Sequence, residues 1–482
     1  MTRTMPTNSA NRTRTGRGGM APMSGSSMRR AGRARWAALL PVMLAAFVAA
    51  VLMTSGAVVD PASVISDPKL PAVCPRMVAT EAGVRVYWLD HYANVPGQRY
   101  ACEVLRLMRR EAPPNGKMGP AEAIAHLGEG DGSFDVEPRG SEAPFLAWNW
   151  YRGAIKEVVW APLPLAPWIP SYPPDPDILG TAALLTGSPV WSSPITDRPV
   201  YSFFTPLHVS VTRAAPSGRL ALVHTLTESR WREPNGLHET SAAVWLHTSD
   251  DGGSTWGVPV CLGPGFGPSA AYLPNEGMVV ARVCTLGPTF AAFAGLDIGI
   301  LPGRGPTHIA LVWDFPGVVL LRAKGADTAE WSPARRLFDF TEVYAVAVAR
   351  DARSGLWIAL TVRANDGDRN SAWFNTEDSR TPSTRIYLAR SADGGQTWTE
   401  PVAVTDGRSS LWQPELIVVG ERLYLAYTRV AKGEAVICLQ ILEAPELGPV
   451  RVRPRELKPG EIEERVAAQP EAGQYNRAPN GR

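Results

Sequence analysis

Short apolar runs, several of them alternating with polar residues, recur along the chain and are separated by turn residues. Two of these runs, Arg385-Ile-Tyr-Leu-Ala and Leu356-Trp-Ile-Ala-Leu, each have the length of one β-strand. Apolar runs of this length, and alternation with a period of two, predict strands. Similar runs begin at Arg219, Ala243 and His308. The pattern therefore predicts an all-β chain.

Two longer stretches repeat the same strand–turn–strand unit. The stretch from Cys74 to Trp88 matches the stretch from Gln413 to Tyr427. In both, a proline opens the first strand, a glycine marks the turn, and the second strand alternates apolar and polar positions. An internal repeat of this kind predicts a fold assembled from similar sheets.

An eight-residue turn pattern, S-x-D-x-G-x-T-W, occurs twice, each time after one of the predicted strands. Asp and Gly favour a tight reversal of the chain, and the tryptophan that follows is large enough to pack the hairpin against its neighbours. The first copy consists of Ser249, Asp251, Gly253, Thr255 and Trp256, and the second of Ser391, Asp393, Gly395, Thr397 and Trp398.

This pattern resembles the Asp-box of sialidase-type β-propellers, which are also called BNR-repeat proteins. In that family the box lies in the turn between the third and fourth strands of a blade, on the rim opposite the active site. The resemblance implies that Asp251 and Asp393 hold turns and have no part in catalysis.

Tryptophans at positions 191, 256, 331 and 398 mark a repeat of about 65 to 75 residues. At that length, residues 68–450 accommodate about six four-stranded blades, a number that propellers use. We therefore expect a sialidase-type β-propeller with about six blades. Three stretches interrupt the repeat: a short helix is predicted over Ala121 to Leu127, and long polar loops over 225–241 and 363–384.

The positive charge of the chain is concentrated at its N-terminus. Residues 1–59 contain eight arginines and no acidic residue, whereas the remainder contains 40 basic and 46 acidic residues. Such a balance gives no reason to expect nucleic-acid binding. Trp36 to Met53 is uncharged, and the arginines before it predict a cytoplasmic N-terminus with the rest of the chain exported.

These features predict five parts. They are a disordered basic tail (1–35), a transmembrane signal-anchor (36–58), a linker (59–70), the propeller (71–450) and a flexible C-terminal tail (451–482). Ser55-Gly56-Ala57 resembles a cleavage site, so a removed signal peptide is the alternative to the anchor. The propeller is then periplasmic or extracellular, tethered in the first case and secreted in the second.

The cysteines leave two readings open. Export permits disulfides, and sequence proximity pairs Cys74 with Cys102 and Cys261 with Cys284, leaving Cys438 single. The alternative is that the cysteines are buried free thiols. Because the sequence has no CxxC, HExxH or Cys/His cluster, we expect no metal site, and nothing in it indicates a cofactor.

Ligands of propellers bind around the central channel, where the first strand of each blade begins. The residues expected there are Arg76, Glu142, Thr205, His208, Glu276, Glu342, Gln413 and Glu415. The two polar loops add indoles and carboxylates of the kind that bind sugars or peptides. The ligand-binding candidates are Arg76, Glu142, Glu276, Glu342, Gln413, Trp231 and Trp373.

A sialidase of this family would need three arginines for the substrate carboxylate, a tyrosine nucleophile assisted by a glutamate, and an aspartic acid. Only Arg76 is predicted in the channel, and Leu411-Trp412-Gln413 stands where the family has its tyrosine. Two functions follow. One is a non-catalytic module that binds a neutral or cationic glycan or an extracytoplasmic protein; the other is a divergent exo-glycosidase that uses channel carboxylates.

Overall fold

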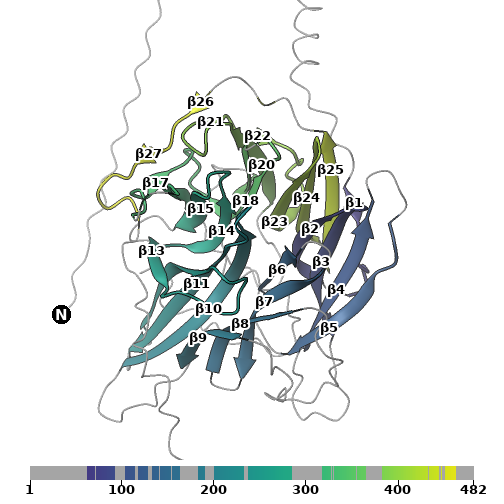
Figure 1. The fold of residues 1–482 in the computed structure, drawn as a ribbon, viewed down its shortest axis with the longest axis horizontal. Coiled ribbons are helices and arrows are strands. Elements are labelled where there is room, and N and C mark those ends of the chain that lie inside the picture. The colour runs from purple at the N-terminus through teal and green to yellow at the C-terminus, as the bar shows by residue number, and fades with distance from the viewer. Residues whose placement is uncertain are drawn as a thin grey trace, which may run out of the picture. The chain divides into compact units, whose positions relative to one another are not determined.

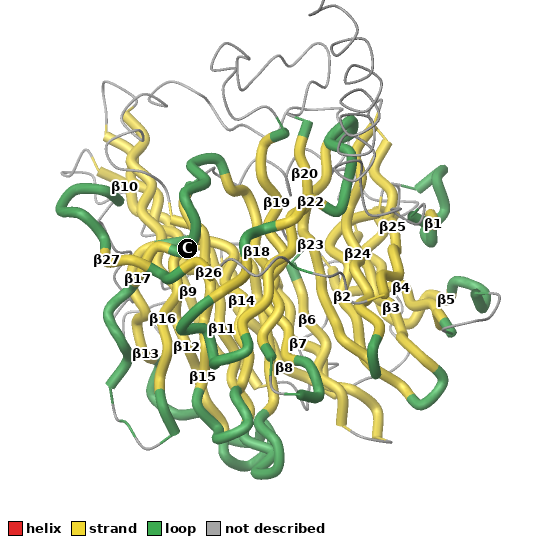
Figure 2. The backbone as a smooth tube through the Cα atoms, turned by 90° about the horizontal axis from the view of Figure 1, so that it is seen from above, coloured by secondary structure: helices red, strands yellow, loops and turns green. Residues whose placement is uncertain are grey.

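All regular structure in the described part of the chain is β-strand (Figure 2). The computed structural model describes residues 62–70, 72–92, 104–113, 118–128, 133–139, 142–152, 155–162, 183–189, 200–232, 237–284, 317–326, 328, 330–353, 355–364, 383–431, 434–443, 447 and 451–462. Residues 1–61 lie outside this part of the chain.

The strands form six large antiparallel sheets, which we name by their first strands. The β2 sheet contains β2 (Ala72–Thr80), β3 (Gly83–Tyr92), β4 (Val104–Ala112) and β5 (Glu122–Gly128), and the β6 sheet contains β6 (Phe134–Arg139), β7 (Glu142–Arg152), β8 (Ile155–Pro162) and β9 (Ala183–Pro189). The β10 sheet contains β10 (Val200–Arg213), β11 (Leu220–Arg232), β12 (Leu237–Ser249) and β13 (Val260–Pro264). The β14 sheet contains β14 (Phe266–Tyr272), β15 (Met278–Cys284), β16 (Val318–Lys324), β17 (Arg335–Arg336) and β27 (Arg455–Glu456).

The two remaining large sheets come from the C-terminal part of the chain, with one strand from the N-terminal part. The β18 sheet contains β18 (Val343–Arg350), β19 (Leu356–Arg363), β20 (Thr384–Ser391) and β22 (Val402–Ala403). The β23 sheet contains β23 (Ser410–Val419), β24 (Arg422–Ala431), β25 (Glu434–Glu443) and β1 (Ser63–Val64). A two-stranded sheet joins β21 (Trp398–Thr399) to β26 (Arg451–Val452).

The first strands contact one another in a closed ring. In order around the ring, β2 contacts β6, β6 contacts β10, β10 contacts β14, β14 contacts β18, β18 contacts β23, and β23 contacts β2 (Figure 1). This arrangement is a β-propeller, so the predicted class of fold is confirmed. Five of the sheets have the four strands expected of a blade. The expected count of about six four-stranded blades is corrected by the β14 sheet, which gains β27 as a fifth strand.

The ring is closed by a strand from the predicted linker. Val64 and Ser63 in β1 pair with Cys438 and Leu439 in β25, so residues that precede the first sheet complete the last one. Ile65, which follows β1, is 1% exposed and packs with the core between these sheets. Truncation of this segment would therefore open the β23 sheet to solvent.

The hydrophobic core lies between neighbouring sheets, because each sheet turns its apolar side chains towards the next. Val279 of β15, Ile358 of β19 and Trp398 of β21 belong to one cluster, and each is at most 1% exposed. Every residue of β19 is buried, as the continuous apolar run from Leu356 predicts. The predicted runs from Arg219, Ala243, Leu356 and Arg385 are found in β11, β12, β19 and β20, and the run from His308 lies outside the described residues.

Several expectations about connections are wrong. The segment from Ala121 to Leu127 is not a helix: Glu122–Gly128 forms β5, because its residues pair with β4. Most of the predicted polar loop 225–241 continues β11 and β12, which pair as far as Arg232 and Leu237. The predicted loop 363–384 lies largely outside the described residues, as does the tryptophan at 191.

Residues 451–462, which we expected in a flexible tail, bind to the outside of the propeller. β26 pairs with β21, and β27 pairs with β17 (Figure 1). The Glu461 carboxylate accepts hydrogen bonds from Arg336 at 2.6 Å and from Arg455 at 2.5 and 2.8 Å. These contacts hold the segment, called the strap below, across two sheets.

Two further expectations concern export. In the part of the chain that the structure describes, no helix is long and apolar enough to cross a membrane, and the segment 36–58 lies outside that part. Cys74, Cys261, Cys284 and Cys438 are free thiols, so the predicted Cys261–Cys284 disulfide is wrong. The two cysteines lie in different sheets, on β13 and β15, despite their short separation along the chain.

Two buried histidines give the fold a dependence on pH. His224 and His247 are 1% and 2% exposed, and their Nε2 atoms lie 3.2 Å apart. Burial lowers the pKa of His224 to about 4 and that of His247 to about 3. The Nε2–Nε2 hydrogen bond requires one ring to donate and the other to accept, so the accepting ring must be neutral, and burial favours the neutral form of both.

We predict that stability falls as the pH drops below about 6.5, the ordinary histidine pKa, towards pH 4. The unfolded chain binds protons first in this range, and His224 alone contributes about 3 kcal/mol that is present above pH 6.5 and lost in acid. Melting temperatures measured between pH 7.5 and 4 check this. The His224→Gln variant should have a flatter profile, and an unchanged profile would contradict the assignment.

Candidate functional site

The first strands share a bulge near the channel. The residue at the bulge has a positive φ of 56° at Cys74, 48° at His208, 52° at Gly267 and 49° at Gln413. The pairing register with the second strand shifts at each of these positions. A bulge re-aims the side chains that follow it. The residues that follow the shift are Arg76, Ser210, Ser269 and Glu415.

Arg76 lies between two carboxylates that come from neighbouring sheets. Its Nε is 3.5 Å from Oδ1 of Asp135 on β6, and its Nη1 is 3.8 Å from Oε2 of Glu415 on β23. Nη1 also donates to the Pro75 carbonyl at 2.8 Å. The three side chains are 11% to 23% exposed, so the cluster is largely shielded from water. We call these three residues the channel cluster.

Burial governs the protonation of the channel cluster. Burial raises the pKa of Glu415 to about 8, although Arg76 opposes the shift. Burial also raises the pKa of Asp135, again against Arg76 and against the hydrogen bonds that its carboxylate accepts. Burial therefore favours the neutral form of both carboxyls, whereas Arg76 favours the ionised form.

Two polar side chains join adjacent first strands. Asp135 accepts hydrogen bonds from the backbone N–H of Val136 at 2.8 Å and of Val211, on β10, at 2.6 Å. Gln413 accepts from the backbone N–H of Cys74 at 2.8 Å and from the Thr428 hydroxyl at 3.2 Å. These oxygens hold backbone groups in place, so the predicted ligand residue Gln413 contributes to the closure of the ring.

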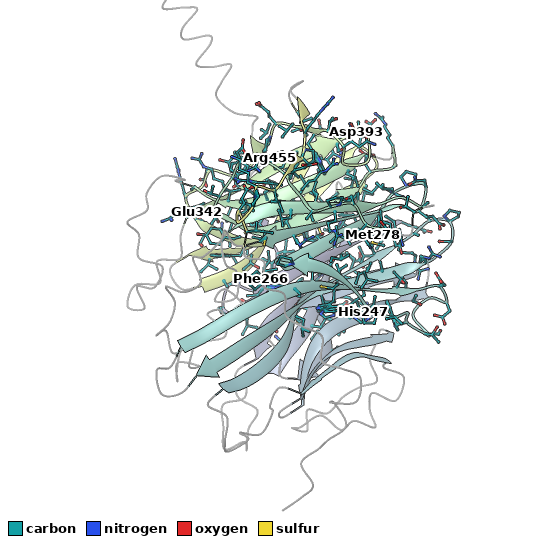
Figure 3. All side chains as sticks on the ribbon, turned by 90° about the vertical axis from the view of Figure 1, so that its left-hand side faces the viewer. His247, Phe266, Met278, Glu342, Asp393 and Arg455 are labelled. Atoms are coloured by element: carbon teal, nitrogen blue, oxygen red, sulfur yellow. The ribbon has the colours of Figure 1, made fainter. Side chains whose placement is uncertain are left out.

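Glu342 is placed where the sequence predicts it, directly before the first strand β18. Its carboxylate accepts from Nη1 of Arg363 at 3.0 and 3.2 Å, and the Arg363 side chain is only 7% exposed. Burial raises the pKa of the neighbouring Tyr344, and the charge of Glu342 raises it further. Figure 3 shows Glu342 and Phe266 on one side of the sheets and Asp393 and Met278 on the other. We call these sides the opening face and the Asp-box face.

Two predicted channel residues lie elsewhere. Glu276 lies in the turn between β14 and β15, at the Asp-box face, where it accepts from the backbone N–H of Ser217 at 3.3 Å. The apolar run from Met278 is a second strand, so the residue before it does not open a first strand. Glu142 likewise begins β7, the second strand of its sheet, and pairs with Arg139.

The predicted loop residues are only partly described. Trp231 lies near the end of β11 and pairs with Tyr201 and His238, and its side chain is not described. Trp373 lies outside the described residues. Thr205 and His208 both belong to β10. Among the predicted opening residues whose side chains are described, Arg76 and Glu415 come from different sheets and contact each other.

Sequence reasoning missed Asp135 and Arg363. Asp135 falls in a stretch that interrupts the repeat, although the run Phe134-Asp-Val-Glu has the alternation of a strand. Arg363 stands at the edge of a predicted loop but ends the second strand β19. Each of these residues is the ion-pair partner of another charged residue, Arg76 or Glu342. The partnership could not be predicted without knowing how the strands and sheets are arranged.

The two Asp-box turns have the same hydrogen bonds. The Asp251 carboxylate accepts from the Ser249 hydroxyl and the Thr255 backbone N–H at 2.8 Å, and from the Thr255 hydroxyl at 2.6 Å. Asp393 accepts from Ser391 and Thr397 at 2.8, 2.8 and 2.5 Å in the same way. Gly253 and Gly395, both with positive φ, donate to the serine hydroxyls at 2.8 Å.

These bonds stabilise the ionised aspartates. Hydrogen bonds from Thr255 and Ser249 lower the pKa of Asp251 to about 2. Burial disfavours ionisation of Asp393, but hydrogen bonds from Thr397 and Ser391 outweigh it and lower the pKa of that carboxyl as well. Both aspartates use their oxygens inside the turn, which agrees with a structural role.

We predict that Asp393→Ala destabilises the protein by about 1 kcal/mol, because exposed hydrogen bonds are lost but no buried charge is left behind. Chemical denaturation measures the change. Gln396→Ala, an exposed change in the same turn, should leave the midpoint unaltered. A variant of Asp393 that keeps full stability but loses ligand binding would overturn the structural role.

Comparisons with known proteins found similar solved structures but no family. No protein-family model and no curated protein matches the chain. Among solved structures, it is similar to a Dyadobacter fermentans protein of unknown function, with 13% identity, 79% of this chain and 97% of that chain covered, and a TM-score of 0.43. It is also similar to the GH93 α-L-arabinofuranosidase of Fusarium graminearum in complex with arabinobiose (12% identity, 80% and 97% covered, TM-score 0.42).

A third similar structure is the Trypanosoma rangeli sialidase in complex with the inhibitor DANA (7% identity, TM-score 0.40). The match covers 79% of this chain but only 58% of the sialidase, so the chain spans less than two thirds of that protein. The chain is a sialidase-like propeller in its fold, as the sequence resemblance implies. Identities of this size concern the fold alone and leave the reaction to be argued from the site.

Proposed function

We propose that this protein is an exported, membrane-tethered propeller that binds a glycan or protein ligand without catalysis. One observation carries the proposal: five charged groups of the channel and its opening contact one another. Arg76 contacts Asp135 and Glu415, and Arg363 contacts Glu342. Both of these guanidinium groups are therefore already paired with carboxylates of the protein.

The arrangement disfavours an anionic substrate. A carboxylate entering the channel would have to displace Asp135 or Glu415 from Arg76, and the displaced carboxylate would lose its partner in a shielded place. At the opening, an anion would likewise have to displace Glu342 from Arg363. A neutral or cationic ligand meets neither obstacle, so we expect ligands of those kinds.

The N-terminal part of the sequence supports a membrane tether. The uncharged run from Trp36 to Met53 follows four arginines, a pattern that retains the N-terminus in the cytoplasm and exports the rest. We predict that protease added to spheroplasts digests residues 60–482, with a cytoplasmic protein as the control. Complete protection would contradict export, and an N-terminus near Val58 in the mature protein would indicate a cleaved signal in place of an anchor.

A glycosidase is the second candidate, and the protonation of the channel cluster favours it. Burial raises the pKa of Glu415 to about 8, which suits a general acid, and the nearby Asp135 is a second carboxylate. Glycosidases use such a pair, with one group protonated and the other ionised. Against this reading, both Asp135 oxygens accept backbone hydrogen bonds and the residue is 7% exposed.

One experiment separates the two candidates. The full chain, purified in detergent, is applied to a glycan array and is incubated in parallel with fluorogenic glycosides, a sialoside included. We expect binding on the array and no release of the fluorophore. Hydrolysis that Glu415→Gln abolishes, in a variant with unchanged melting temperature, would refute the non-catalytic function and establish the glycosidase.

A further inference from the structure

A groove of about 980 Å³ lies at the Asp-box face, between the β18 and β23 sheets. Its walls come from the β18–β19 turn, from β20 with the second Asp-box, and from the β23–β24 turn. The volume is at the upper end of the range for ligand pockets. The residues on which its chemistry depends are Asp351, Arg353, Trp357, Arg390, Glu421 and Glu443.

The floor of the groove is fixed by hydrogen bonds. Asp351 accepts from the Gly355 backbone N–H at 2.7 Å, from Nη2 of Arg390 at 2.8 Å and from Nε1 of Trp357 at 3.1 Å. The Arg390 guanidinium lies over the Trp357 ring, 5.6 Å from its centroid. A Cβ at Gly355 would lie 2.6 Å from both Asp351 and Arg390, so only glycine permits this arrangement. The Arg390 side chain, 32% exposed, is thus held in place before any ligand arrives.

The rim carries an ion pair that is available to a ligand. Arg353 donates to Glu421 at 3.0 Å, and the two side chains are 81% and 87% exposed. An ion pair this exposed contributes little to stability. Its donors and acceptors can therefore turn to a ligand with little loss to the fold.

The groove mixes both signs of charge. Arginines at 353, 390 and 422 and carboxylates at 351, 393, 421 and 443 line it, although the Asp393 oxygens accept hydrogen bonds inside the turn. An anion meets four carboxylates there, and a cation meets three guanidinium groups. A neutral polyhydroxylated molecule donates to the carboxylates and accepts from the guanidinium groups with the same hydroxyls. The lining therefore matches an uncharged sugar better than a charged ligand.

We propose that this groove is the binding site for a neutral oligosaccharide, with Arg353 and Glu421 at the rim and Arg390 on the floor. The inference rests on the proposed binding function and gives it a place and a ligand class. The site lies on the face opposite Glu342, so binding leaves the channel cluster untouched. Thr397 and the rest of the second Asp-box turn form one wall of the groove. The turn therefore contributes to binding by shaping the groove.

The test uses the full chain in detergent and immobilised unsialylated, unsulfated oligosaccharides of two to six sugars, with sialylated and sulfated counterparts. The variant Arg353→Ala/Glu421→Ala removes the rim pair. Its matched control is Arg219→Ala/Asp250→Ala, which removes an exposed pair of the β10 sheet. We expect wild type and control to bind neutral oligosaccharides alike, and the rim variant to bind about tenfold more weakly at an unchanged melting temperature.

The outcomes distinguish this inference from the function on which it rests. If the rim variant binds neutral oligosaccharides as tightly as the wild type does, the groove is not the binding site, although the protein still has a binding function. Binding of sialylated or sulfated sugars alone would overturn the ligand class. Turnover of glycosides without retained binding would overturn the proposed function itself.

Discussion

Replacing Trp398 with alanine is expected to lower the free energy of unfolding by about 3–5 kcal/mol, the usual cost of deleting a buried indole. Trp398 is 1% exposed and packs with the core cluster between the β14 and β18 sheets. Its Nε1 donates to the Gly395 carbonyl at 3.1 Å, and its backbone pairs with Val452 of the strap. The substitution removes all the side-chain contacts and leaves a cavity beside the strap.

The chain contains a matched control for this prediction. Trp256 occupies the same place in the first Asp-box but is only partly buried, so Trp256→Ala should cost clearly less. Urea denaturation of both variants gives the comparison, and limited proteolysis reports whether the strap is released in the Trp398 variant. Equal losses for the two tryptophans would contradict the packing described for the second box.

The second large effect is expected for Arg76→Met, which keeps the volume of the side chain but removes its charge. Asp135 and Glu415 then lie in a shielded channel without their cation, and breaking such a cluster costs about 3–5 kcal/mol. The loss should shrink in acid, because protonation of Asp135 removes the unpaired charge. Denaturation at pH 7 and pH 5 measures both effects.

Asp135→Asn is the companion to this variant. Added to Arg76→Met, it removes the uncompensated charge and should restore part of the lost stability. Arg109→Ala, which breaks the exposed ion pair with Glu122, should cost under about 1 kcal/mol and serves as the control. An Arg76→Met variant as stable as the wild type would show that the cluster does not hold the first strands together.

The sequence was most informative where the chain forms tight, repeated structure. The hydrogen bonds of each Asp-box turn join side chains and backbone groups within eight residues. The sequence pattern alone is therefore enough to predict the turn. The strand–turn–strand unit from Gln413 to Tyr427 is equally local, and β23 and β24 form as predicted. The propeller followed from these repeats.

Long-range pairing was not predictable in the same way. β26 and β27 have two residues each, too few for any periodicity, and they are strands only because β21 and β17 lie beside them. The first strand β14, Phe266-Gly-Pro-Ser-Ala-Ala-Tyr, has a weak apolar pattern. Glu276, expected where a first strand begins, lies instead in the turn that follows β14.

The candidate site was predicted only in part, for a related reason. Arg76 and Glu415 were expected near the channel because each directly follows the proline that opens a predicted first strand. Their shared partner Asp135 was not, since nothing local to Asp135 indicates that the β6 sheet lies next to the β2 sheet. Which charges neutralise one another is decided by the order of the sheets around the ring.

The central claim, that the channel charges serve one another and not a ligand, is tested most directly with Glu415→Gln. Burial favours the neutral form of this carboxyl, and the amide is uncharged and of nearly the same size. The measurement is the affinity of the full chain for the oligosaccharide that binds best on the array, in the wild type and in this variant. We predict equal affinities and a melting temperature within a few degrees; a variant that stays folded but no longer binds would contradict the account.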